Sequence, residues 1–204
     1  MPILALVLVV VWVAVVVGWR TWLQVRQTGT VAPLVRPAAG SPAWWARLLT
    51  SLGFLMAILA PIAHALGVGR IAVLDQPAAL LLGLGLYLVG LVLTVVAQVA
   101  MGDAWRGDVD PSASTRLVTD GPFRIVRNPI MSGILLTWIG LALIVPTVVA
   151  VAMLILFLVA LEIQVRLVEE PYLLRAHGEA YRRYASRTGR FVPGIGRWRV
   201  EPGS

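Results

Sequence analysis

The segment from Ile130 to Val165 constrains the fold more than any other part of the chain. It is almost wholly apolar over 36 residues, and as a single α-helix it would be about 54 Å long. A bilayer core is about 30 Å thick, so one span is excluded. Pro146 lies where a turn is needed. We therefore predict a helical hairpin of two spans, Ile130–Val145 and Thr147–Val165.

Three further apolar segments, Pro2–Val17, Leu48–Val68 and Pro77–Ala100, precede this hairpin. The chain is 59% hydrophobic and 13% charged, whereas soluble domains are about half apolar and a quarter charged. The fold class expected is an all-α integral membrane protein with about five transmembrane helices. The 204 residues leave room for a single membrane domain, with three N-terminal spans in residues 1–100 and a functional region in residues 101–194.

The basic residues indicate an orientation. All 17 are arginine, and they lie mainly in the first loop, in the loop after the third span, and in the tail from residue 166. By the positive-inside rule, the N-terminus is outside and the C-terminal tail is cytoplasmic. Nucleic-acid binding is a poor explanation for the net charge of +7, because the arginines flank spans rather than form one stripe. The arginine-rich, lysine-free composition suggests a GC-rich bacterial source, and hence the inner membrane.

Several common kinds of site are not supported. The chain has no cysteine, which excludes disulfides and cysteine-ligated zinc, and two isolated histidines, His64 and His177, make a histidine metal site improbable. We interpret His64 as a packed polar residue in the second span, with a proton relay as the alternative. Gly83, Gly85 and Gly90 lie inside the third span, so they indicate close helix packing rather than a dinucleotide-binding turn.

Polar residues concentrate in two stretches, Met101–Pro129 and Glu162–Gly194. In the first, Gly121-Pro122 and Asn128-Pro129 are turn sequences, because proline fixes φ and disfavours helix in the preceding residue. At membrane depth, such irregular backbone is tolerated only where it is buried in protein or lines a polar cavity. Pro129 suits the first position of a helix, whose N-terminal end would favour an anionic group.

In the second stretch, Glu162, Arg166 and Glu169 or Glu170 recur at helical spacings of four and three. They form either an interfacial salt-bridge ladder or a site in which carboxylates meet the ammonium of an amino-acid-like ligand. Tyr172–Ala185 then follows as an amphipathic helix, which we expect to lie on the membrane surface.

Together, the two stretches resemble the isoprenylcysteine carboxyl methyltransferase family and its phospholipid methyltransferase relatives. The resemblance is carried by "LVTDGPFRIVRNPIMSG", an apolar hairpin, and then "RLVEEPYLLRAHGEAYRRYASRTGRFVPG", and it covers about residues 101 to 194. It implies an integral-membrane enzyme that binds S-adenosylmethionine on the cytoplasmic side. The methyl acceptor would be a lipid or isoprenoid small molecule that enters from the bilayer, and a carboxylate acceptor would need no general base.

The resemblance also implies site residues. Arg166 would lie near the acceptor, where it could orient a carboxylate, and Asn128 would be the second catalytic residue. The positions implied in cofactor binding are Thr115, Arg116, Leu117, Val118, Phe123, Asn128, Pro129, Ile130, Met131, Glu169 and Glu170. The chain departs from the family pattern at three of them: Asn128 replaces histidine, while Met131 and Phe123 replace tyrosine. Asparagine can exchange hydrogen bonds but cannot become cationic.

Two other functions fit the same features. Sterol-reductase-like membrane proteins have a similar C-terminal helical arrangement but bind NADPH. A lipid-binding membrane protein that has lost catalysis would explain the departures at Asn128 and Met131. If an amine or hydroxyl were methylated, a proton acceptor would be required, for which the glutamates or Asp108 are the candidates.

Overall fold

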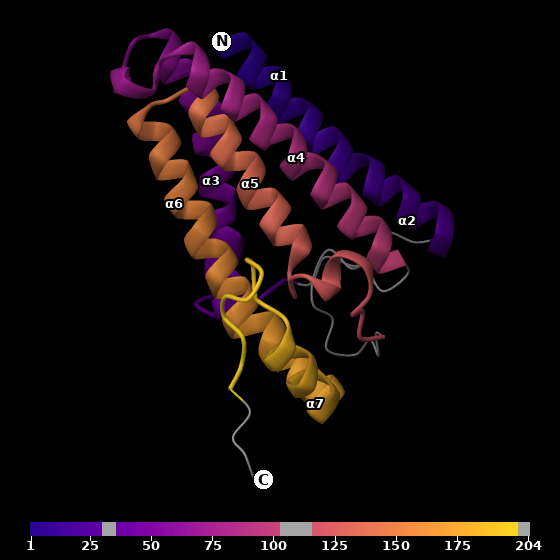
Figure 1. Ribbon diagram of the computed structural model, residues 1–204. Helices are drawn as coiled ribbons and strands as arrows, with labels where there is room; N and C mark the ends of the chain where they lie inside the picture. Colours follow the sequence, from indigo (N-terminus) through magenta and orange to yellow (C-terminus); the bar gives the residue numbers. More distant parts are fainter. Residues whose placement is uncertain (30–35, 103–115, 200–204) are drawn as a thin grey trace.

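The computed structural model describes residues 1–29, 36–102 and 116–199, and within these ranges the regular structure is helical (Figure 1). The elements are α1 (Pro2–Trp12), the π-helical η1 (Val13–Trp19), α2 (Arg20–Thr28), α3 (Pro42–Ala65), the short 3-10 turn η2 (Ala72–Leu74), α4 (Pro77–Met101), the 3-10 turn η4 (Gly121–Arg124), α5 (Pro129–Ile144), α6 (Val148–Ile163), the π-helical η5 (Gln164–Glu169) and α7 (Glu170–Arg187). The expected all-α fold is confirmed.

Among the described residues, four helices are long and apolar enough to cross a membrane: Pro2–Arg26, Pro42–Ala65, Pro77–Met101 and Val148–Arg187. The fifth apolar helix, α5, has only 16 residues. The first span is longer than the predicted Pro2–Val17, because α1, η1 and α2 form one continuous helix. The second begins earlier than predicted, at Pro42, where the hydroxyl of Ser41 accepts a hydrogen bond from the N–H of Trp44 and caps the helix.

The predicted hairpin is present, and its turn is fixed from both sides. Within the turn, the hydroxyl of Thr147 accepts a hydrogen bond from the N–H of Ala150 and caps α6. From outside, the N–H of Ile71 donates to the carbonyl of Pro146 at 2.9 Å. The loop between α3 and α4 is thereby tied to the hairpin at the end of the bundle where the N-terminus lies (Figure 1).

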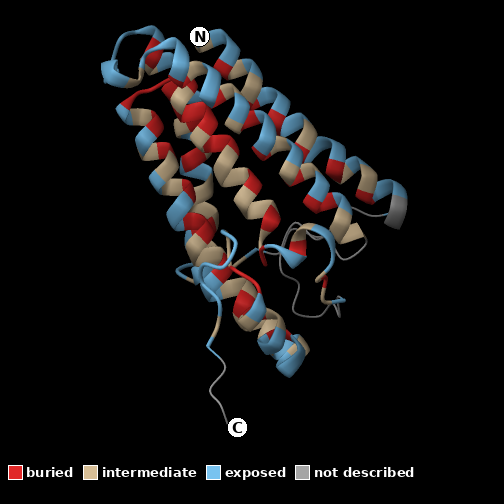
Figure 2. Cartoon of the chain, in the orientation of Figure 1, coloured by how far each residue is buried: buried red, intermediate tan, exposed pale blue. Residues whose placement is uncertain are grey.

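Helix α5 is the centre of the bundle, and none of its residues is exposed (Figure 2). It packs against α4 through two pairs of glycines seven residues apart, Gly83 with Gly140 and Gly90 with Gly133. A Cβ built on Gly83 would lie 2.7 Å from the Gly140 carbonyl oxygen, and one on Gly133 would lie 2.7 Å from the Gly90 carbonyl oxygen. The predicted packing role is confirmed for Gly83 and Gly90, whereas a Cβ on Gly85 would meet nothing within 4 Å.

An aromatic cluster joins four helices in the middle of the bundle. Trp138 of α5 stacks on Phe157 of α6, with ring centroids 4.8 Å apart and planes 4° from parallel. Phe54 of α3 and Trp12 of α1 complete the cluster, with centroids 5.0 to 5.5 Å from those of their neighbours. Such contacts stabilise an arrangement beyond simple area burial, so the long helices are fixed around α5.

Helix α7 contains the tail helix that the sequence predicts at Tyr172–Ala185. It is not a separate helix, because it is continuous with the last span. It continues α6 through the π-helical η5 without a break as far as His177, a stretch of 30 residues from Val148 that is about 45 Å long. Because this length exceeds a bilayer core, α7 projects beyond the bundle (Figure 1). It bends at Gly178, whose φ of 51° is a left-handed conformation that favours glycine.

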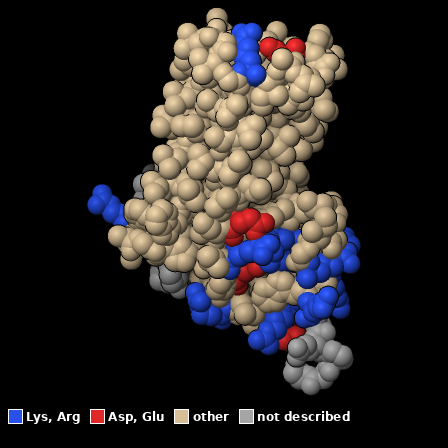
Figure 3. Space-filling model, turned by 90° about the vertical axis from the view of Figure 1, so that its left-hand side faces the viewer, with Lys and Arg blue, Asp and Glu red and all other residues tan. Residues whose placement is uncertain are grey.

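Charge is distributed unevenly along the bundle. The end formed by η4, η5, α7 and the residues after α7 carries most of the described arginines, and we call it the arginine-rich end (Figure 3). The opposite end carries Arg70 and Asp75, whose side chains lie 3.7 Å apart. The polar features of the sequence therefore gather at one end of an otherwise apolar molecule.

Candidate functional site

The predicted site begins in the segment that precedes α5. Residues 117–120 run without regular structure into the 3-10 turn η4, where Gly121 has a φ of 57°. The side chain of Phe123 is buried in this turn, and it packs with Val118 and with Ala97 of α4. Ile130, at the start of α5, lies against the same cluster. These apolar residues fix the turn to the end of α4.

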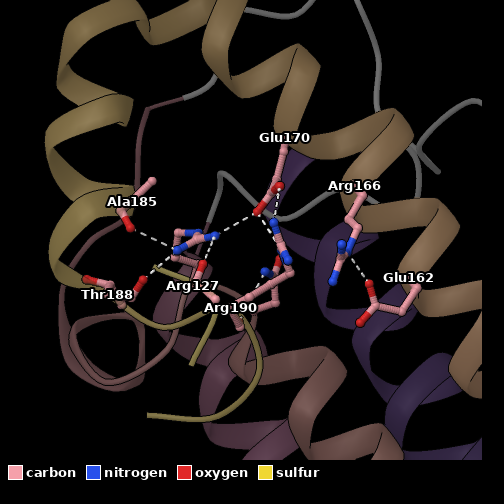
Figure 4. A network of polar contacts seen from close by, with 9 residues as sticks. Arg127, Glu162, Arg166, Glu170, Ala185, Thr188 and Arg190 are labelled. Carbon is pink, nitrogen blue, oxygen red and sulfur yellow. Dashed lines mark hydrogen bonds and ion pairs between the residues drawn. The ribbon is translucent and has the colours of Figure 1, made fainter. Parts of the chain in front are cut away.

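Arg127 is the centre of the polar network at the arginine-rich end (Figure 4). Its Nη2 donates to Glu170 Oε1 at 2.8 Å and to the carbonyl of Gly196 at 3.1 Å. Its Nη1 donates to the carbonyls of Ala185, at 3.0 Å, and of Thr188. One buried guanidinium therefore joins the segment before α5, the beginning and end of α7, and the chain that follows α7.

Glu170 is held by two arginines. Besides Arg127, the guanidinium of Arg190 donates from Nε to Oε1 and from Nη2 to Oε2, both at 2.9 Å (Figure 4). The hydrogen bonds to Glu170 raise the pKa of Arg190 above its usual value. Both oxygens of the buried Glu170 are thus engaged by cations of the chain itself.

The residues after α7 fold back over the start of α5. The N–H of Asn128 donates to the carbonyl of Arg190 at 3.1 Å, and its side-chain Nδ2 donates to the same oxygen at 3.3 Å. One turn further along α5, the hydroxyl of Ser132 donates to the carbonyl of Phe191 at 2.6 Å. The tail therefore covers the side of α5 that carries the Asn128-Pro129 motif.

Glu169 has a different environment from its neighbour Glu170. It is the last residue of the π-helical η5, and its Oε1 accepts a hydrogen bond from Gln164 Nε2 at 3.2 Å. Among the described residues, no arginine or histidine forms an ion pair with Glu169. Within the same turns, Arg166 pairs with Glu162 (Figure 4). The predicted pairing of Glu162 and Arg166 on one face is confirmed, while the two adjacent glutamates have separate partners.

The predicted site residues fall into four groups. Thr115 and Asp108 lie outside the described residues. Arg116 is exposed, Leu117 is half-buried, and Val118 and Phe123 are buried in the core beside α4. Asn128, Pro129, Ile130 and Met131 form the beginning of α5, and Arg166, Glu169 and Glu170 lie where α6 passes into α7. The last two groups are linked by Arg190, whose backbone carbonyl contacts Asn128 and whose side chain contacts Glu170.

The start of α5 has a further property relevant to ligands. Asn128 is its N-cap residue, yet the asparagine side chain makes no capping hydrogen bond. The first turn of an α-helix leaves backbone N–H groups without intrahelical partners, and their positive end favours an anion. Arg190 thus ties the uncapped N–H groups of α5 to Glu170, and the preceding residue, Glu169, has no cationic partner among the described residues.

Sequence reasoning missed three residues of this region. The positive-inside rule explains Arg127 and Arg190 as topological charges, whereas both are central to the network. The amphipathic pattern of 172–185 places Tyr184 at a membrane interface, whereas its hydroxyl donates to the carbonyl of Phe123 at 2.7 Å. The position of Arg127 directly before the Asn128-Pro129 turn was the available signal, since an arginine entering a buried turn requires a buried partner.

His64 lies away from this region, in α3. It is buried, as predicted, and its Nε2 lies 3.5 Å from Asp75 Oδ1. In the part of the chain that the structure describes, no three histidine, aspartate or glutamate side chains gather as a metal site would require.

Comparison with known proteins shows which family this region of the chain resembles. The family model for phospholipid methyltransferases matches residues 78–180, just over half of the chain. The matched region runs from α4 through the turn η4 and the hairpin to α7, and so includes Arg127, Glu169 and Glu170. A comparison with curated proteins gave no match.

Proposed function

The chain belongs to the phospholipid methyltransferase family and is a membrane methyltransferase; on this premise we propose that S-adenosylmethionine is its methyl donor. The observation that carries the proposal is that Arg190 ties the uncapped start of α5 to Glu170, the residue next to Glu169. When bound, S-adenosylmethionine supplies an electrophilic methyl group on a sulfonium. The chain's own residues have to bind its amino-acid group, orient the acceptor and exclude water.

The amino-acid group of this donor carries both an ammonium and a carboxylate, and the proposed site offers a partner for each. Glu169 suits the ammonium, because it has no ion-pair partner among the described residues. The backbone N–H groups of Ile130 and Met131 suit the carboxylate, because they lie in the uncapped first turn of α5. Residues 115–118 and Phe123, which the family resemblance implies, would complete the site.

We assign Glu170 a different role from the one that its sequence position suggests. Its two oxygens already accept hydrogen bonds from Arg127 and Arg190, and it is buried. Removing it from these cations would leave the buried guanidinium of Arg127 and the half-buried one of Arg190 without this counter-charge. Glu170 therefore holds the tail against α5 and positions Glu169 rather than binding the donor itself.

The proposed acceptor is a lipid or isoprenoid-type molecule with a carboxylate. Arg166, whose guanidinium is half-exposed and pairs with Glu162, is the cation that would orient such a group. A carboxylate is methylated without loss of a proton, so alignment and desolvation are sufficient. This requirement suits a site in which Asn128, which cannot act as a base, replaces histidine.

We also propose that the arginine-rich end faces the cytoplasm of a bacterial cell and that the N-terminus lies outside. The uneven arginine distribution supports this orientation through the positive-inside rule. It would give the site direct access to a soluble donor, while the acceptor reaches it from the bilayer.

Calorimetric titration of the purified protein with S-adenosylhomocysteine tests the donor site. Wild type should bind, and Glu169→Gln should weaken binding by about tenfold to a hundredfold, as loss of a charge-assisted hydrogen bond does. Glu179→Gln is the matched control, since Glu179 is an exposed residue of α7. Absence of binding to wild type, or equal binding to Glu169→Gln, overturns the assignment. Binding of NADPH in place of S-adenosylhomocysteine would favour the reductase.

A second experiment identifies the acceptor. Purified protein is incubated with S-adenosylmethionine labelled in its methyl group and with a total membrane lipid extract, and the labelled product is identified by mass spectrometry. A methyl ester supports a carboxylate acceptor, whereas a labelled amine contradicts it. Binding of the donor without transfer to any lipid would favour a protein that has lost catalysis.

A further inference from the structure

A cavity of about 500 Å³ lies at the arginine-rich end, outside the set of residues assigned above to the donor and acceptor. It is formed between the turn η4 and the C-terminal half of α7. Its lining consists of three arginines, two threonines and a tyrosine: Thr119, Arg124, Arg183, Tyr184, Arg187 and Thr188. Among the described residues no carboxylate lines this cavity, and the charged side chains of its lining are all arginines.

The three arginines of the cavity differ from the other arginines around them. Arg127 and Arg190 pair with Glu170, Arg166 pairs with Glu162, and Arg182 lies 3.8 Å from Glu179. Within the described ranges, Arg124, Arg183 and Arg187 form no such ion pair. Like charges brought together repel one another unless an anion lies between them. The cavity thus has the charge of an anion site that the chain's described residues do not fill.

The walls of the cavity are held in place by hydrogen bonds. The hydroxyl of Tyr184 donates to the carbonyl of Phe123 at 2.7 Å, which joins α7 to the turn η4 across the cavity. The carbonyl of Thr188 accepts from the buried guanidinium of Arg127, and the N–H of Thr188 donates to the backbone carbonyl of Tyr184 at 3.1 Å. The arginines therefore project from preformed backbone, which lowers the entropic cost of binding a ligand.

From this geometry we propose that the cavity binds a phosphate group. Guanidinium groups form paired hydrogen bonds to phosphate oxygens, and three of them with two threonine hydroxyls match its charge and its several acceptors. Ile125, adjacent to Arg124, is 61% exposed, which sets an apolar side chain beside the cationic cavity. Basic pockets at the end of a transmembrane bundle suit lipid headgroups. The phosphate can belong to a phospholipid of the bilayer or to a free anion, and the proposal does not depend on methyl transfer.

Calorimetric titration in non-ionic detergent tests this proposal. The probes are a short-chain phosphatidic acid, inorganic phosphate, and the diacylglycerol with the same chains but no phosphate. Wild type should bind the phosphatidic acid and not the diacylglycerol. The double variant Arg183→Ala/Arg187→Ala should bind it at least about tenfold more weakly. The control Arg175→Ala/Arg182→Ala removes the same charge from the same helix outside the cavity and should bind as wild type does.

Each other outcome is decisive. Inorganic phosphate that binds as tightly as the phosphatidic acid supports the site with a free anion as its ligand, while much weaker binding supports a lipid. Equal weakening in the control variant overturns the proposal in favour of general charge attraction. Displacement of the phosphatidic acid by S-adenosylhomocysteine also overturns it, because the cavity would then belong to the donor site. The variant Arg183→Lys/Arg187→Lys keeps the charge and guards against misfolding; it should bind with intermediate affinity.

Discussion

Glu170 Oε1 lies 2.8 Å from Arg127 Nη2, and the two side chains are only 6% and 1% exposed. The residues are 43 positions apart in the chain, on either side of the hairpin. Their pairing closes the arginine-rich end, because Arg127 also binds three carbonyls at the end of α7 and in the tail. The attraction within a buried ion pair adds little net stability to the fold. Removing one partner is nevertheless strongly destabilising, because the other charge is left buried without a counter-charge.

Glu170→Gln is therefore expected to destabilise the protein strongly. The amide keeps the size of the side chain but leaves the buried Arg127 and the half-buried Arg190 without this counter-charge, which costs about 3–5 kcal/mol of unfolding free energy. Unfolding in mixed detergent micelles, followed by tryptophan fluorescence, measures this loss. The matched control is Glu179→Gln, which breaks the exposed 3.8 Å pair with Arg182 and should cost less than about 1 kcal/mol. Similar losses in both variants would contradict a structural role of Glu170.

Replacing glycines of α4 and α5 by alanine should distinguish the effect of close helix packing on stability from the effect of helix propensity. Gly133→Ala would place a Cβ 2.7 Å from the carbonyl oxygen of Gly90, so the helices have to move apart. Overpacking of this kind costs about 1–3 kcal/mol. Gly85→Ala is the control, since its Cβ meets nothing within 4 Å and alanine favours helix by about 0.5–1 kcal/mol. Thermal unfolding in detergent should thus give a lower Tm for the first variant and an unchanged or higher Tm for the second.

The parts of the fold that were predictable rest on hydropathy. The hairpin follows from an apolar run that is too long for one span and from Pro146 near its middle, and the structure places its turn there. The end of the first span was less predictable. Polar residues from Arg20 onward suggest a stop, but Arg20 is buried and donates to the carbonyl of Gly102 at 2.7 Å, so the helix continues past it.

The arrangement of the candidate site was harder to predict. Regular α-helical spacing correctly joins Glu162 to Arg166, but it gives no reason to separate Glu169 from Glu170. The π-helical η5 ends at Glu169 and changes the helical phase of both glutamates relative to Glu162, and π-helical turns are often found at functional sites. The partners of Glu170 are Arg127 and Arg190, and Arg190 reaches Glu170 only because the tail folds back over α5. Local periodicity carries no information on that long-range contact.

The proposed orientation can be tested with single cysteines, because the chain contains none. Ala72→Cys lies in η2 between α3 and α4, and Ala180→Cys lies on α7; both positions are exposed. A membrane-impermeant thiol reagent applied to intact cells, or to spheroplasts where an outer membrane is present, should label Ala72→Cys. It should label Ala180→Cys only after the membrane is permeabilised. The reverse pattern would place the arginine-rich end outside, and the cysteine-free wild type controls for background labelling.

Arg166 and Glu169 should affect different kinetic parameters, although they are only three positions apart in the sequence. If Arg166 orients the acceptor carboxylate, Arg166→Gln raises the KM for the acceptor by about tenfold to a hundredfold and leaves the Kd for S-adenosylhomocysteine nearly unchanged. Glu162→Gln should act in the opposite direction, because loss of its pair with Arg166 frees the guanidinium for the acceptor and lowers that KM. Steady-state rates of formation of the labelled lipid product, at varied acceptor concentration, measure the KM of both variants. Arg175→Gln is the charge-matched control. An amine acceptor would reverse the expected effects, since it would be repelled by Arg166 and attracted by Glu162.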